Sequence, residues 1–165
     1  FTQPQPMGSK NLKKYPKEIR GTYQVRILSE GDMTEPAEDT LKIATDHYQE
    51  YNDSTDLKIF LSDSCVLRAH RKNHFINFKG KRDSHWTSAF IKKESNGNLI
   101  IYGLFDGDDV QEEVFIEAVN AITAVSKETS EDGETKYNIS PSNEELSRLV
   151  DEQFFKPVYE LIRLK

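Results

Sequence analysis

Between residues 21 and 105, hydrophobic and polar side chains alternate in short runs separated by turn-forming residues about every ten positions. In the first run Tyr23, Val25 and Ile27 alternate with polar residues, which is the period of a strand with one buried face. Further strands are expected to start at residue 41 and to span residues 57–61, 65–69, 74–79, 86–93 and 99–105. This succession predicts a mainly β fold, an antiparallel up-and-down β-barrel.

Loops and tight turns are expected between these strands. Residues 29–39 are rich in Glu, Asp, Gly and Pro, and residues 47–54 are polar without a clear period, so we interpret the latter as a frayed strand end and a loop. The strongest hairpin signal is Asn96-Gly97, because this pair tolerates the two positive φ angles of a type I′ turn. We therefore expect a two-residue turn there.

After residue 105 the periodicity becomes helical. Residues 106–109 predict a turn and an N-cap, and a helix should follow and cover the last strand of the meander, which is apolar on both faces. Its apolar positions are Val110, Val114, Ala118 and Ile122. Residues 121–127 and 137–139 are then expected to form a hairpin that turns at Asp132-Gly133.

A second helix and a final strand complete the chain. Ser140 and Pro141 are expected to supply the N-cap and the first helical position. The apolar stripe of this helix consists of Leu146, Leu149 and Val150. Pro157 excludes further helix, so residues 158–164 are expected to form the strand that closes the barrel, with one or two helices packed outside it.

The beginning and end of this predicted barrel resemble those of lipocalins and other calycins. Gly21-Thr22-Tyr23 resembles their Gly-x-Trp signature, with Tyr in place of Trp, and a late helix followed by a short strand bearing Arg163 resembles how that superfamily ends. In the family a basic side chain near the C-terminus packs over the aromatic ring, so the resemblance implies a cation–π contact between Arg163 and Tyr23.

The resemblance covers about residues 17–165 and extends to small lipoproteins of Gram-negative bacteria that have lipocalin-like barrels and no assigned activity. It implies that the barrel binds a small apolar ligand. The residues that we expect to contribute to ligand binding or barrel closure are Tyr23, Arg163, Trp86, Phe90 and Tyr102.

Residues 1–16 are expected to be a flexible tether ahead of a single domain of residues 17–165, because a segment of Pro, Gln, Gly and Ser has nothing to bury. One interpretation is the remainder of a processed lipoprotein signal, and the other is a cloning remnant at Met7-Gly8-Ser9. The first predicts a lipid-anchored cell-envelope protein that faces the periplasm or the cell exterior and contacts the membrane only through the removed anchor. A tether also predicts that residues 1–14 are dispensable for folding.

Charge is distributed unevenly along the chain. Residues 66–93 contain eight Lys or Arg and one acid, whereas residues 106–153 contain fourteen acids and three Lys or Arg. One interpretation is a basic surface that meets an anionic partner or lipid headgroups, and the other is that the two segments neutralise each other in the fold. The basic surface would comprise Arg68, Arg71, Lys72, Lys79, Lys81 and Arg82. The formal net charge of −6 argues against nucleic-acid binding.

Candidate reactive groups have structural explanations. His70, His74 and His85 could bring imidazoles together for zinc, but the Lys and Arg side chains around them would repel a cation. Residues 106–109 are acidic but lack the spacing of a calcium loop, and Cys65 alternates with apolar residues, as a buried, inert thiol would. Since nucleophile elbows and glycine-rich phosphate loops are also lacking from the sequence, we expect neither an enzyme nor a metal or other cofactor.

Two functions therefore remain open. The first is a non-catalytic barrel that binds a small apolar ligand, and the second is a packed, ligand-free barrel that engages another envelope protein through the basic hairpin surface of residues 66–93. The volume of the barrel interior separates them, because large inward side chains would fill a packed barrel.

Overall fold

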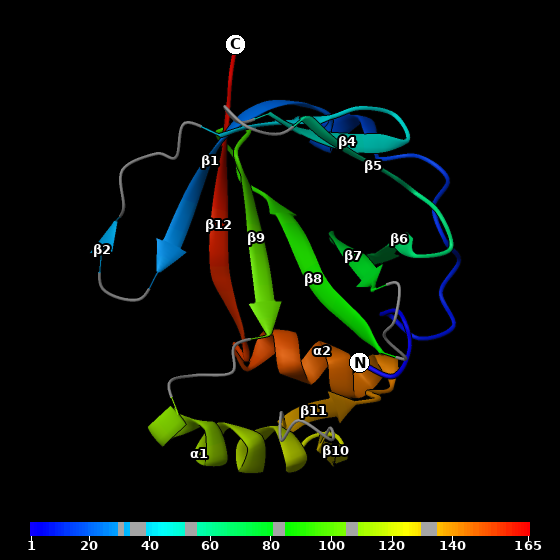
Figure 1. Cartoon of the computed structure of the whole chain (residues 1–165), viewed down its shortest axis with the longest axis vertical. Helices are drawn as coiled ribbons and strands as arrows, with labels where there is room; N and C mark the ends of the chain where they lie inside the picture. Colours follow the sequence, from blue (N-terminus) through cyan, green and yellow to red (C-terminus); the bar gives the residue numbers. More distant parts are fainter. Residues whose placement is uncertain (30–31, 34–38, 52–55, 81–84, 105–108, 130–134) are drawn as a thin grey trace.

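One antiparallel sheet forms the body of the protein in the computed structural model, which describes residues 1–165 except 30–31, 34–38, 52–55, 81–84, 105–108 and 130–134 (Figure 1). Its strands are β1 (Gly21–Ser29), β3 (Thr40–Ile43), β4 (His47–Tyr51), β5 (Asp56–Phe60), β6 (Cys65–His70), β7 (Asn73–Lys79), β8 (Trp86–Lys93), β9 (Leu99–Leu104) and β12 (Phe155–Arg163), and the short β2 (Asp32–Met33) pairs with β1. The remaining elements are the 3-10 helix η1 (Lys17–Ile19), helices α1 (Asp109–Asn120) and α2 (Asn143–Asp151), and the hairpin of β10 (Val125–Thr129) and β11 (Thr135–Ile139).

Most neighbouring strands of the sheet also follow each other in the sequence, as in a meander, and the last strand of the sequence is the exception. The sheet runs β5-β4-β3-β1-β12-β9-β8-β7-β6, so β12 lies between β9 and β1. The β1–β12 register places Tyr23 opposite Arg163 and Ile27 opposite Tyr159. The first and last strands of the sequence are therefore neighbours, as expected.

The two edges of the sheet are β5 and β6, which follow each other in the chain. Within the described residues no backbone pairing joins them, so the expected closed barrel is not confirmed. Instead, the N–H of Leu12 donates to the Leu67 carbonyl oxygen of β6 at 2.8 Å. The N-terminal segment therefore meets one edge of the sheet.

The two faces of the sheet belong to two separate apolar clusters. Leu67, Ile76 and Ile91 point to the inner face, in a cluster that also contains Tyr23 and Leu161. Because neighbouring side chains on a strand alternate, Phe75 and Phe90 point to the opposite face. There they pack with Phe155 and with Leu146 and Leu149 of α2. Figure 1 shows α2 crossing one end of the sheet, with α1 beyond it.

The N-terminal segment packs against the sheet, so the expectation that it has nothing to bury is wrong. Phe1, Gln5, Pro6 and Tyr15 are all buried. Gln5 exchanges hydrogen bonds with the buried Asn77 side chain, donating its N–H to Oδ1 at 2.7 Å and accepting from Nδ2 at 2.9 Å. The N-terminal segment therefore packs through separate aromatic and amide side chains. It lacks the apolar periodicity by which a strand is normally recognised in a sequence.

Strand β4 and helix α1 differ from the sequence expectations. Strand β4 lies where a frayed end and a loop were expected, since it pairs with β3 and β5 through backbone hydrogen bonds that side-chain periodicity does not encode. The buried face of α1 is turned by one position: Val114 and Ala118 are exposed, whereas Val119 is buried. The reason is that the hairpin and the sheet cover the side of α1 that carries Val119.

Helix α2 begins two residues later than predicted. Ser142 is its N-cap and forms a capping box: its hydroxyl accepts the Glu145 N–H, and the Glu145 carboxylate accepts the Ser142 N–H at 2.7 Å. Ser140 was the wrong choice because only Ser142 has a Glu three residues later that can complete the box.

Replacing Ser142 with Ala is expected to lower the free energy of unfolding by about 1 kcal/mol, because the Glu145 N–H loses its acceptor. Ser140→Ala is the matched control and should change it by less than about 0.5 kcal/mol, since Ser140 is exposed. Urea denaturation of both variants measures the difference. Equal losses would contradict the assignment of the cap.

The turn after β8 contains three residues rather than the expected two. Glu94 and Asn98 are joined by a backbone hydrogen bond, and residues 95–97 form the loop between them. Only Gly97 has a positive φ, of 92°, so the turn is not of type I′, which needs two.

Replacing Gly97 with Val is nevertheless expected to cost roughly 1 kcal/mol or more, because a β-branched residue is strained at this φ. Gly97→Asn should cost less, since Asn tolerates positive φ better. Thermal denaturation of both variants tests this order. A Val variant as stable as the unmodified chain would mean that this backbone conformation is wrong.

Candidate ligand-binding cavity

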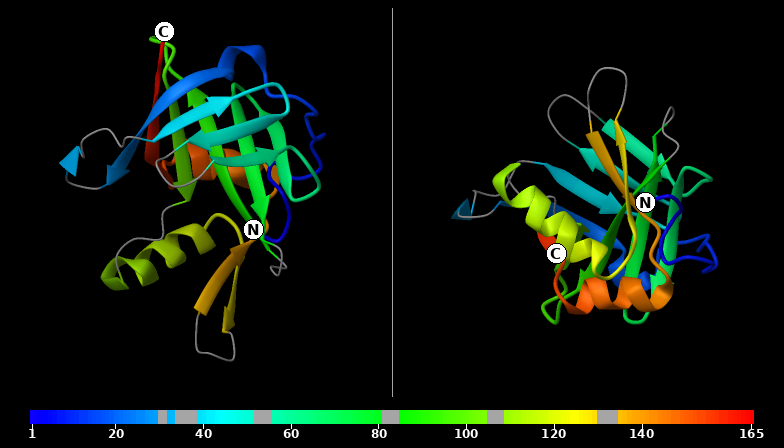
Figure 2. Two further views of the ribbon diagram at one scale, coloured as in Figure 1. Left: turned by 45° about the horizontal axis from the view of Figure 1, so that its top comes forward. Right: turned by 90° about the horizontal axis from the view of Figure 1, so that it is seen from below.

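A cavity of about 990 Å³ lies between the inner face of the sheet and the layer of α1 and the β10–β11 hairpin. Figure 2 shows this layer beside one end of the sheet. The sheet contributes apolar side chains that alternate along its strands, among them Val25, Leu41, Ile43, Ile76, Ala89 and Ile101. The helix and the hairpin contribute Phe115, Ile116, Val119 and Tyr137. The volume lies at the upper end of the range of about 300–1,000 Å³ that small-molecule sites occupy.

Two residues that line this cavity, Tyr15 and Asn138, carry buried polar atoms. The Tyr15 hydroxyl interacts with the Cys65 thiol, and the Asn138 amide nitrogen has no hydrogen-bond partner among the described residues. Tyr15 is 1% exposed and Asn138 is 5% exposed. The Tyr15 backbone N–H donates to Thr45 in the β3–β4 turn, whereas Asn138 lies on β11. The two polar groups are therefore held by different elements of the fold.

Burial raises the pKa values of Tyr15 and of the groups around it. It raises the pKa of the Tyr15 and Tyr48 phenols above their ordinary value, and it raises the pKa of the Cys65 thiol to about 11. Cys65 is therefore protonated at neutral pH and is a poor nucleophile. Burial also raises the pKa of Glu50, with a further contribution from the nearby Asp39 carboxylate.

Tyr23 and Arg163 meet at the end of the sheet where η1 packs. The Arg163 guanidinium carbon lies 5.9 Å from the centroid of the Tyr23 ring, so the predicted contact is confirmed. The Tyr23 hydroxyl donates to the Ile19 carbonyl oxygen at 2.9 Å, and Arg163 donates to the Arg20 carbonyl oxygen at 3.0 Å. Burial raises the pKa of Tyr23, and the positive charge of Arg163 opposes that shift. Neither side chain lines the cavity.

Of the other three predicted ligand residues, one lines the cavity and two do not. Trp86 lines the cavity, and Lys79 Nζ lies 5.8 Å from the centroid of its ring. The Phe90 and Tyr102 rings stack with centroids 4.5 Å apart in the cluster under α2, on the opposite face. Their neighbours Ala89, Ile91, Ile101 and Gly103, which alternate with them, line the cavity instead. Trp86 lines it from the start of β8, although it packs against the same cluster as Phe90.

The residues of the predicted basic surface have separate roles. Arg68 holds the N-terminal segment, donating to Asn11 Oδ1 at 2.8 Å and to the Pro4 and Pro6 carbonyl oxygens. Arg71 pairs with Asp151 of α2 at 2.9 Å. Lys72 and Lys79 are exposed, and Lys81 and Arg82 lie outside the described residues. The Arg71–Asp151 pair joins the basic segment to the acidic one, as the neutralising interpretation expected.

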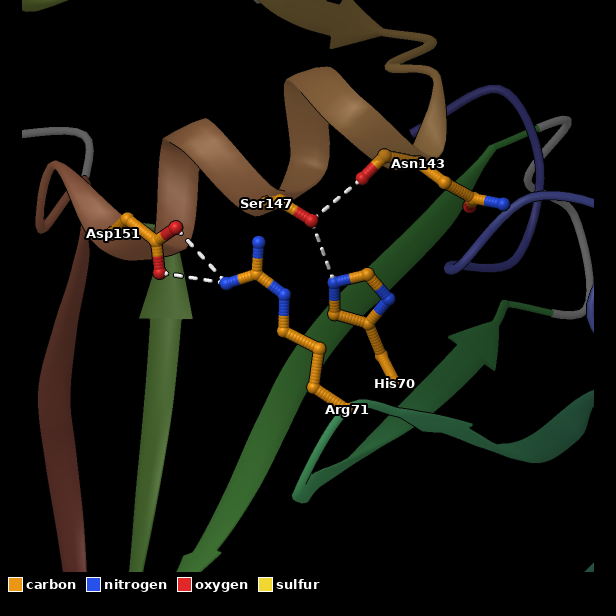
Figure 3. Close-up of polar contacts among 5 residues, drawn as sticks. All are labelled: His70, Arg71, Asn143, Ser147 and Asp151. Carbon is orange, nitrogen blue, oxygen red and sulfur yellow. Dashed lines mark hydrogen bonds and ion pairs between the residues drawn. The ribbon is translucent and has the colours of Figure 1, made fainter.

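His70 and Ser147 form a polar contact that also joins the β6–β7 hairpin to α2 (Figure 3). The Ser147 hydroxyl donates to the Asn143 carbonyl oxygen at 2.8 Å and lies 3.0 Å from His70 Nε2. Since the hydroxyl proton is used by Asn143, the Ser147 oxygen accepts from His70, and His70 is not its general base. Burial and the charge of Arg71 lower the pKa of His70, which favours this neutral donor.

Within the part of the chain that the structure describes, no group of three His, Cys, Asp or Glu side chains is placed to hold a metal ion. His70 contacts α2, whereas His85 pairs with Glu128 of β10 at 3.3 Å. None of the described helices is long and apolar enough to cross a membrane.

Sequence patterns missed the polar residues of the cavity. Tyr15 follows a stretch without periodicity, and Glu50 lies in the segment interpreted as a loop. Asn138 was included in a predicted strand, but no local signal indicated that its side chain would be buried without a partner. An isolated aromatic residue in a Pro-rich segment was the only available signal for Tyr15.

Comparison with known proteins identifies no relative: no protein-family model, curated protein or solved structure matches the chain.

Proposed function

We propose that this chain is a non-catalytic binding protein that holds a small apolar ligand in the cavity under the sheet. The observation that carries the proposal is the cavity of about 990 Å³ with its predominantly apolar lining. A packed barrel that acts only through its outer surface would have filled this space with side chains, because protein interiors are close-packed. The exclusion of water from such a lining favours apolar ligands.

In this proposal the sheet functions as a lipocalin-like barrel whose β5–β6 seam is completed by the N-terminal segment. The strand order and the β1–β12 pairing support this arrangement, as does the hydrogen bond from Leu12 to β6. The envelope location rests on the composition of the N-terminal residues and stays a prediction.

Binding of the uncharged fluorescent probe N-phenylnaphthylamine tests the proposal. Its fluorescence should rise on addition of the protein and saturate at one probe per chain. Ala89→Phe should weaken binding at least about tenfold by placing a ring in the cavity, whereas Ala69→Phe, on an exposed position of β6, should leave it unchanged.

Thermal denaturation of both variants establishes that they fold, and Val25→Phe provides a second cavity-filling variant. If the probe does not bind the unmodified chain, or if it binds equally well to the folded cavity-filling variants, the proposal is wrong.

A further inference from the structure

We propose that the ligand is an amphiphile whose apolar tail lies in the cavity and whose positively charged head group, such as a protonated amine, binds beside Glu50 and Asp39 at the open end of the cavity. This inference rests on the proposed function, because it specifies the ligand class of the same cavity.

One end of the cavity is open to solvent. Ile27 of β1 and Tyr159 of β12 both line the cavity, yet they are 48% and 43% exposed. Glu112, near the start of α1, lines the cavity as well. Figures 1 and 2 show the end of β1 beside the start of α1 and away from the β10–β11 hairpin. A ligand bound here keeps its polar head group in contact with water while its tail is buried.

Strand pairing holds two carboxylates, those of Glu50 and Asp39, on the wall of this part of the cavity. Glu50 lies opposite Leu41 in the β3–β4 register, and Asp39 precedes Leu41 by two residues. The two acids are therefore diagonal neighbours on the same face of the sheet. The Asp39 carbonyl oxygen accepts the Val25 N–H at 3.0 Å, which fixes Asp39 beside β1, close to the exposed Ile27.

The negative charges of this pair are not neutralised by the protein. Burial raises the pKa of Glu50, and the Asp39 carboxylate raises it further. Among the described residues no Lys or Arg forms an ion pair with Glu50 or Asp39. A cation on the ligand would be attracted by both carboxylates and would offset their mutual repulsion.

The cationic side chains of the described lining belong to the other end of the cavity. Lys136 lies on β11, and His85 pairs with Glu128 of β10 at 3.3 Å. The charged lining is thus divided by sign, with carboxylates at the open end and cations toward the hairpin. A positively charged head group therefore suits the open end better than a carboxylate does.

The lining beyond the two carboxylates is apolar and includes Ile43, Ile76 and Ile91. An amphiphile matches both parts of the cavity, because its head group meets the acids and its tail meets the apolar wall. A hydrated metal ion would leave the apolar part without an occupant, so the observations favour an organic cation with a tail.

The experiment measures how well three ligands with the same ten-carbon chain displace bound N-phenylnaphthylamine at neutral pH. They are decylamine, which is positively charged, decan-1-ol, which is uncharged, and decanoate, which is negatively charged, each used below its critical micelle concentration. The measured quantity is the ratio of the decylamine affinity to the decan-1-ol affinity, which cancels the contribution of the shared chain. Decylamine should bind about fivefold more tightly than decan-1-ol, and decanoate should bind most weakly.

Glu50→Gln is expected to lower this ratio about three- to fivefold, because it removes one negative charge without changing the size of the side chain. Glu144→Gln is the matched control: it makes the same change at an exposed position of α2 outside the lining and should leave the ratio unchanged. Glu50→Asp keeps the charge and should keep most of the ratio. Thermal denaturation establishes that all three variants fold.

Salt provides a second measurement. Raising the ionic strength from about 0.01 M to about 0.1 M should lower the ratio more in the unmodified chain than in Glu50→Gln, because salt screens the attraction between the head group and the carboxylates.

Any of four results would overturn the inference while leaving the proposed function intact: no displacement of bound probe by decylamine, equal affinities for decylamine and decan-1-ol, a ratio that is unchanged in Glu50→Gln or falls equally in Glu144→Gln, or tighter binding of decanoate than of decylamine. If the probe does not bind the unmodified chain, the proposed function fails together with the inference.

Discussion

Deleting residues 1–14 is expected to lower the free energy of unfolding by about 4 kcal/mol or more. The deletion removes the buried Phe1 side chain, whose burial contributes about 1.5–3 kcal/mol. It also leaves Asn77, which is 0% exposed, without the two hydrogen bonds to Gln5, at a cost of about 1–3 kcal/mol. Arg68 loses all its acceptors in this segment as well.

Urea denaturation followed by far-ultraviolet circular dichroism measures this loss. Met7→Ala is the control within the same segment, and it should change stability by less than about 0.5 kcal/mol because Met7 is exposed. A loss below about 1 kcal/mol on deletion would restore the interpretation of the segment as a tether.

Replacing Tyr23 with Ala is expected to destabilise the chain by about 3 kcal/mol, the scale of large aromatic truncations in a core. Tyr23 is 0% exposed, its hydroxyl donates to Ile19, and Arg163 lies over its ring. Tyr159→Ala provides a control at an aromatic position on the partner strand: it should cost less than about 1.5 kcal/mol, because Tyr159 is 43% exposed.

A double-mutant cycle separates the stabilisation that comes from the Tyr23–Arg163 contact from the stabilisation that comes from burial of Tyr23. The loss in the Tyr23→Ala, Arg163→Ala double variant should be smaller than the sum of the single losses by about 0.5–1 kcal/mol, since either substitution alone already removes the cation–π contact. Strictly additive losses would show that the two side chains do not stabilise each other and would remove the energetic basis of the resemblance to lipocalins.

The strands were predictable wherever one face of the chain is buried and the other exposed. Tyr23 and Val25 show the period of two because they face the inner cluster, and Ile27 continues it toward the cavity. The contact between Tyr23 and Arg163 was expected from the resemblance, and the β1–β12 register brings it about. Of the aromatic residues that were expected at a ligand site, Trp86 lines the cavity, but the sequence did not distinguish it from Phe90 and Tyr102, which pack under α2.

That failure has a physical reason. Aromatic residues are suited both to a cavity wall and to a packed core, and the face on which they lie depends on the register and on what covers the sheet. Phe90 and Tyr102 stack under α2, whose position depends on contacts with Phe75 and Phe155 from other strands. The alternation of side chains predicts which residues share a face of the sheet, but it does not predict which residues border the cavity.

By itself, the sequence determined the local structure of this protein: the strand periods, the apolar stripe of α2 and a glycine in the turn after β8. These depend on interactions between residues close in the chain. Only the tertiary structure decided the roles of Tyr15 and Asn138, the anchoring of the N-terminal segment by Asn77 and the size of the cavity. These depend on groups far apart in sequence, and an unpartnered donor is defined by what surrounds it after folding.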